Sequence, residues 1–154
     1  VPAVIVPDEE TSIEVVKELD PVTDPSLFNL EINKADGSAV TFINDVTNGG
    51  TTGTVALLDG NYVIEETAGT GTDLSFYETE ITCVDRNSGT VLAQGTGSSL
   101  PVTLTLGADM LCTVYNTKAP AIIIEKVALD GDGTFNFTSS SPEIGNFSMR
   151  VEVL

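Results

Sequence analysis

Three polar side chains lie on the otherwise apolar faces of three predicted β-strands: Lys17, Glu66 and Asn116. In a strand, every second residue points to the same face. Lys17 shares its face with Ile13 and Val15, Glu66 with Tyr62 and Ile64, and Asn116 with Cys112 and Val114. The alternation predicts that all three groups point into one core. Because an isolated buried charge is costly, we expect the three groups to meet there.

Such a meeting makes one reaction possible. Burial favours the neutral forms of an amine and of a carboxyl group. The neutral amine of Lys17 can then attack the side-chain carbonyl of Asn116, while Glu66 polarises that carbonyl and shuttles the proton. Ammonia leaves, and an amide cross-links the first strand to the last. The alternative is a buried salt bridge or hydrogen-bonded cluster without covalent chemistry.

The strands that must position these groups are short and separated by turns. Alternation over two residues predicts strands at 13–20, 27–32, 39–43, 54–58, 62–67, 74–84, 91–94, 101–106 and 110–116, of which 74–84 is the longest. Turn residues follow most of them, as in Asp59-Gly60-Asn61. This many short strands within roughly 105 residues is typical of an all-β sandwich.

A partial internal repeat follows this unit. IIIEKVALD (122–130) resembles IEVVKELD (13–20) and places Lys126 where the first copy has Lys17, and TFNFTS then aligns with LFNLEI. The second copy lacks the glutamate, the asparagine and both cysteines. We expect a complete sandwich over 12–118 and the first strands of a second, incomplete repeat over 119–154. Residues 1–11 form an arm, either a linker or frayed end or a donor strand that completes a neighbour.

The two cysteines, Cys83 and Cys112, both fall on inward faces of different strands. A single disulfide is the simpler interpretation, and it implies an oxidising compartment. On the chain-entropy model, closing this loop stabilises the fold by roughly 3 to 4 kcal/mol. Two buried free thiols are the alternative.

The charge balance excludes several partner classes. The chain of 154 residues carries 23 acidic and 6 basic residues, a net charge of −17. Such a surface repels nucleic acid and anionic lipid, and it favours solubility outside a cell over a dedicated cation-binding surface. The longest apolar runs, 3–6 and 121–124, are far too short to span a bilayer.

No motif for turnover, cofactor or metal binding stands out, so no enzyme activity, cofactor or metal is expected. The chain has no His. The DGDG run at 130–133 is more typical of a turn than of a calcium loop, which would need a distal Glu. Asn136 and Asn146 fit the N-glycosylation pattern, which matters only in a host that glycosylates.

Three segments in order resemble a known family: IEVVKELD, GNYVIEETA and CTVYNTK. They resemble the prealbumin-like (Cna-B or SpaA type) Ig-like repeats of bacterial surface proteins and pilins, over 12–118 in full and 119–154 in part. The resemblance implies that Lys17, Glu66 and Asn116 are the family's isopeptide residues, and that the two cysteines pair as in one subgroup. The chain departs from the pilin-like pattern at Ala68-Gly69-Thr70 and carries no LPxTG-like sorting motif.

We therefore expect a non-enzymatic extracellular structural protein at a cell surface or in a secreted fibre. It would form a stalk, pilus or filament through tandem repeats, head-to-tail self-association or strand complementation. The alternative is a monomeric cell-surface adhesion or ligand-binding module that uses loops such as 44–53 or 85–99. These loops are poor in aromatic residues, which counts against sugar stacking.

Overall fold

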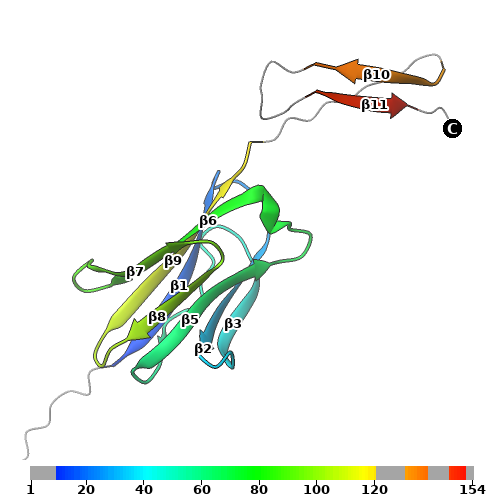
Figure 1. Cartoon of the computed structure of the whole chain (residues 1–154). Coiled ribbons are helices and arrows are strands. Elements are labelled where there is room, and N and C mark those ends of the chain that lie inside the picture. The colour runs from blue at the N-terminus through cyan, green and yellow to red at the C-terminus, as the bar shows by residue number, and fades with distance from the viewer. Residues whose placement is uncertain (1–9, 121–130, 139–145, 152–154) are drawn as a thin grey trace, which may run out of the picture. The chain divides into compact units, whose positions relative to one another are not determined.

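The computed structural model describes residues 10–120, 131–138 and 146–151. The chain divides into two compact units, Val1–Ala119 and Pro120–Leu154, and each is described by itself. Figure 1 shows the first unit as two facing layers of strands and the second as a hairpin. Within the described residues, no helix has the length and apolar character that crossing a membrane requires.

The first unit consists of nine strands and one short helical turn within the described residues. The strands are β1 (Ser12–Asp20), β2 (Phe28–Lys34), β3 (Ala39–Val46), β4 (Val55–Ala56), β5 (Gly60–Ala68), β6 (Tyr77–Asp85), β7 (Val91–Thr96), β8 (Ser99–Leu104) and β9 (Asp109–Lys118). A 3-10 turn, η1 (Leu74–Phe76), precedes β6. The prediction of an all-β sandwich is confirmed.

The strands form two sheets that face each other (Figure 1). One sheet has the order β4-β1-β9-β6-β7, and the other has the order β3-β2-β5-β8. β9 pairs in parallel with β1 along the whole length of β1, from Ser12 opposite Asp109 to Asp20 opposite Thr117. The first and last strands of the unit are therefore neighbours, although almost the entire sequence of the domain separates them.

The core lies between the two sheets and follows from the alternation of apolar residues. Val15 and Val114 reach it from the first sheet, and Leu30 and Ile64 from the second, and all four are fully buried. Burying an aliphatic side chain of this size stabilises a fold by about 1.5 to 3 kcal/mol. These residues thus provide the apolar setting in which any inward-pointing polar group must lie.

Two predicted strands are shorter in the structure. Residues 74–76 belong to the 3-10 turn, because the Asp73 side chain caps it by accepting a hydrogen bond from the Ser75 amide at 2.9 Å. The prediction that 74–84 forms the longest strand was therefore wrong, and β9 is longer than β6. Only Val55–Ala56 of the predicted strand 54–58 pairs, opposite Ile13 and Ser12 of β1.

The second unit contains β10 (Gly133–Phe137) and β11 (Phe147–Val151), which pair antiparallel. Phe137 stacks on Phe147 with ring centroids 5.0 Å apart, and Phe135 pairs with Met149. Asn136 lies exposed in β10, and Asn146 lies exposed just before β11. The arm residues 1–9, Lys126 and Asp130 lie outside the described residues.

Candidate functional site

Lys17, Glu66 and Asn116 come together between the two sheets. Lys17 lies in β1 and Asn116 in β9, which are adjacent strands of one sheet, whereas Glu66 lies in β5 of the facing sheet. Their residue exposures are 0%, 2% and 0%. The alternation that fills the core with Val15, Ile64 and Val114 thus also directs these polar groups inward.

The Glu66 carboxylate bridges the other two side chains. Its Oε1 lies 2.8 Å from Lys17 Nζ, and its Oε2 accepts a hydrogen bond from Asn116 Nδ2 at 2.9 Å. Lys17 Nζ also donates to the backbone carbonyl of Val114 at 3.2 Å. The contact between Nζ and Oε1 is an ion pair without hydrogen-bond alignment, and Asn116 Oδ1 accepts no hydrogen bond from the described residues.

Burial dominates the electrostatics of Lys17. Loss of hydration lowers the pKa of the Lys17 ammonium below its usual value, and the attraction of the Glu66 carboxylate only partly restores it. The ring of Phe28 lies 4.5 Å from Nζ and also favours the charged form. The net effect makes a neutral amine more accessible here than on a lysine in water.

Two members of this cluster were missed from the sequence: Thr79 and Phe28. Thr79 lies in β6, and its hydroxyl donates to Glu66 Oε2 at 3.3 Å. It shares the inward face of β6 with Ile81 and Cys83, so the same alternation could have found it. Phe28 is the first residue of β2 and is fully buried against the lysine.

The predicted disulfide between Cys83 and Cys112 is present. The two cysteines lie directly opposite each other on β6 and β9, and both are fully buried. The alternative of two free thiols was therefore wrong. The bond closes a sequence separation of 29 residues inside the segment that Lys17 and Asn116 bracket.

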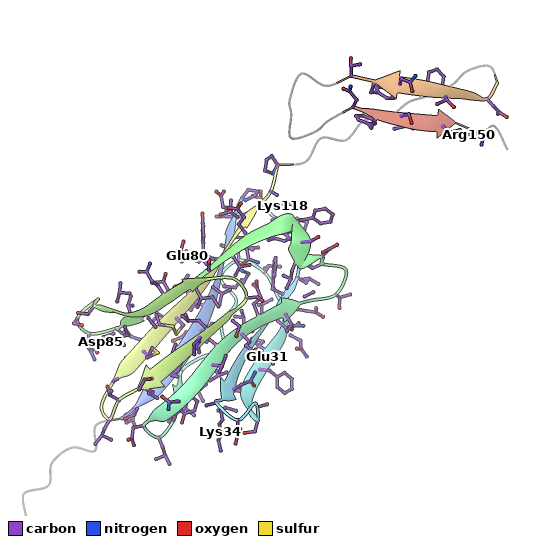
Figure 2. All side chains as sticks on the ribbon, in the orientation of Figure 1. Glu31, Lys34, Glu80, Asp85, Lys118 and Arg150 are labelled. Atoms are coloured by element: carbon purple, nitrogen blue, oxygen red, sulfur yellow. A yellow bond between two sulfur atoms is a disulfide. The ribbon has the colours of Figure 1, made fainter. Side chains whose placement is uncertain are left out.

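A second polar cluster lies where β9 ends, and we call Asp24, Ser26, Tyr77 and Lys118 the exit clasp. Asp24 Oδ2 accepts from the Tyr77 hydroxyl at 2.8 Å and lies 3.0 Å from Lys118 Nζ, while Oδ1 accepts from the Ser26 amide at 3.0 Å. Figure 2 labels Lys118 at this end of the unit. No pattern in the sequence indicates this cluster, because Asp24 lies in a loop without periodicity.

The exit clasp shifts the pKa of its carboxyl group. Burial alone raises the pKa of Asp24, because its side chain is only 1% exposed. The hydrogen bonds from Ser26, Lys118 and Tyr77 outweigh burial, so the pKa of Asp24 lies well below its usual range. Asp24 is therefore a carboxylate that the fold holds in its charged form.

Within the described residues, no group of three or more His, Cys, Asp or Glu side chains is placed to hold a metal ion. Asp130 of the DGDG run lies outside the described residues; Gly131 and Asp132 precede β10, which begins at Gly133.

Comparison with curated proteins finds no significant match. Among solved structures, the major pilin from Streptococcus pyogenes is 19% identical, with 71% of this chain and 48% of that chain covered and a TM-score of 0.48. A variant of the same pilin with a glutamate changed to alanine is 18% identical at the same coverage, with a TM-score of 0.48. The chain spans about half the length of these pilins.

A family model supplies the assignment. Its match covers residues 12–118, which begin with β1 and end with β9, so that it contains both sheets and the cluster of Lys17, Glu66 and Asn116. The chain belongs to the family described as the prealbumin-like fold domain.

Proposed function

We propose that this chain is a non-enzymatic structural module of an extracellular stalk, pilus or filament, stiffened by a disulfide and by an isopeptide bond between Lys17 and Asn116. The observation that carries the proposal is the buried contact of Glu66 with both of the other side chains. Membership of the prealbumin-like family supports it as well. The disulfide adds support for an oxidising, extracellular setting.

The geometry suits a single transamidation. Neutral Lys17 Nζ attacks Asn116 Cγ, the Nζ–Cγ bond forms, and the Cγ–Nδ2 bond breaks. The step uses Glu66 as the acid with its proton on Oε2. Oε1, 2.8 Å from Nζ, takes a proton from the attacking nitrogen, while Oε2, 2.9 Å from Nδ2, gives its own proton to the leaving nitrogen, so the carboxyl group carries one proton before and after the step. One amide and one amine become one amide and one ammonia, without any external reagent.

A bond at this place suits a mechanical role. The first strand of the domain, β1, begins at Ser12, and the last strand, β9, ends at Lys118. A covalent tie between Lys17 and Asn116 would carry tension from the first strand directly to the last. The sheet hydrogen bonds between them would then bear little load.

The domain organisation is proposed in the same terms. Residues 12–118 form the complete domain, and 119–154 contain the first strands of a second repeat. The aligned strands of the two copies support this, because Phe135 and Phe137 alternate with exposed residues in β10, as Phe28 and Leu30 alternate with half-buried residues in β2. Tandem repeats, head-to-tail polymerisation or donation of residues 1–11 to a neighbouring sheet would complete the second repeat.

Intact-mass measurement of the folded, non-reduced protein tests the cross-link. The expected mass is lower than the sequence mass by one ammonia and by the two thiol hydrogens of the disulfide. Peptide mapping should then recover the segments around Lys17 and Asn116 as one branched species. A full-length mass with no ammonia lost would leave only a buried ion-pair cluster.

The assembly role has a separate test. The protein should be isolated from its native surface and separated on denaturing, non-reducing gels. Ladders of bands from polymers that resist dissociation are expected. A discrete monomer that binds a specific ligand would instead support the adhesion or ligand-binding module.

A further inference from the structure

Thr79 occupies a particular position beside the proposed cross-linking groups. It lies on β6 directly opposite Asn116 of β9, so the two side chains are neighbours on the inner face of one sheet. Its hydroxyl donates to Glu66 Oε2, the same oxygen that accepts from Asn116 Nδ2. Glu66 Oε2 therefore has two donors, whereas Oε1 faces Lys17 Nζ.

This arrangement fixes an otherwise loose torsion. The last torsion of a glutamate side chain has a broad preference, so the carboxyl group can turn about it at little cost. Threonine is branched at Cβ and has few accessible rotamers, which makes its hydroxyl a comparatively rigid donor. A hydrogen bond from Thr79 thus disfavours rotation of the carboxyl group away from the two reacting nitrogens.

We propose that Thr79 is a positioning residue for cross-link formation, whose hydroxyl keeps Glu66 Oε2 at Asn116 Nδ2 and Oε1 at Lys17 Nζ. The inference rests on the proposed cross-linking function. One proton must leave Nζ for one carboxyl oxygen while a second proton passes from the other carboxyl oxygen to Nδ2, so only one orientation of the carboxyl plane serves both nitrogens. Without the hydroxyl, a smaller fraction of the molecules has the Glu66 carboxyl group in the competent orientation. The rate of cross-link formation falls in proportion to that fraction.

Cross-link formation in the full chain can be timed directly. The chain is made by cell-free synthesis under disulfide-forming conditions, quenched in acidic denaturant at intervals, and weighed for loss of ammonia. We expect Thr79→Ala to slow this loss by about tenfold, the effect of losing one hydrogen bond to an ionisable group. Thr79→Ser keeps the hydroxyl and should react within about twofold of the parent rate.

Two further variants separate positioning from folding. Thr82→Ala makes the same change on the opposite face of β6 and should leave the rate unchanged. Thr79→Val keeps the shape of threonine and should be as slow as Thr79→Ala, which covers the case in which alanine leaves a cavity. Melting temperatures identify the variants that remain folded.

Each outcome is decisive. If the parent chain never loses ammonia, the cross-linking function and the role of Thr79 both fall. If the parent reacts and the alanine and valine variants match its rate, the cross-link stands and Thr79 has no part in it. A serine variant as slow as the alanine variant assigns the effect to the methyl group. If Thr79→Ala and Thr79→Val both unfold, the role of Thr79 is structural. This result overturns the proposal, and so does a slow serine variant.

Discussion

Lys17 and Asn116 lie diagonally across two parallel strands. Lys17 is opposite Val114, and Asn116 is opposite Leu19, so the two residues are offset by two positions along the pair. Diagonal neighbours on one face of a strand pair are about 7 to 8 Å apart at Cα. An extended lysine side chain can cover that span, whereas a partner directly opposite would require it to fold back. The offset therefore places the amine near the amide and leaves room for Glu66 from the facing sheet.

Asn116→Ala tests the covalent tie through stability. The variant has no amide to attack, so its mass should show no loss of ammonia. For a loop of about 100 residues, the chain-entropy model gives about 4.7 kcal/mol of stabilisation, which the variant should lose. Chemical denaturation of the parent and the variant measures the difference. Asn44→Ala, at an exposed position of β3, is the matched control and should change stability little. Equal stabilities of the parent and Asn116→Ala would contradict a tie.

The buried ion pair predicts non-additive mutational effects. In the Asn116→Ala background, where no cross-link can form, Lys17→Met leaves the Glu66 carboxylate buried without its partner. Removing one member of a buried pair costs about 3 to 5 kcal/mol. Adding Glu66→Met removes the stranded charge and should recover more than half of that loss. Urea unfolding of the Asn116→Ala background, of each single change added to it and of the two changes together measures the coupling. Simple addition of two losses would show that the carboxylate and the amine do not depend on each other.

Much of the site was predictable because alternation depends only on local sequence. It places Lys17, Glu66 and Asn116 on inward faces, and the structure shows all three buried. Alternation says nothing about which strands are neighbours, so the parallel pairing of β1 with β9 could not be derived from it. Thr79 was accessible to the same argument, but threonine is common on both faces of strands and does not stand out.

The parts that escaped prediction depend on loop geometry. The capping of η1 by Asp73 shortened a segment whose composition alone favoured a strand. The exit clasp requires the loop after β1 to fold over Tyr77 and Lys118, which lie more than 50 residues further along the chain. No local pattern encodes such a contact.

The exit clasp makes a pH-dependent contribution to stability. The folded pKa of Asp24 lies below its unfolded value of about 3.9, so its contribution is fully present above that pH and is lost as the pH falls below it. Asp24→Asn should destabilise the protein by about 1 to 3 kcal/mol at neutral pH and progressively less below pH ~4. Denaturant titrations across pH give the profile. Asp36→Asn changes an exposed carboxylate that accepts hydrogen bonds from the amide and the hydroxyl of Ser38, and it should show little effect. A destabilisation by Asp24→Asn that persists unchanged in acid would rule out a charged clasp.

The order of the two covalent links predicts how the domain responds to force. Cys83 and Cys112 both lie between Lys17 and Asn116 in sequence, so an isopeptide bond would remove the disulfide from the path of tension. A domain pulled at its two ends by single-molecule force spectroscopy should then show no large extension, with or without reductant. In Asn116→Ala the domain should unfold, and reduction should release the loop closed by the disulfide. Its 29-residue separation corresponds to about 100 Å of extended chain. If the parent domain also lengthens by this amount when reduced, tension passes through the disulfide and the isopeptide bond does not bear the load.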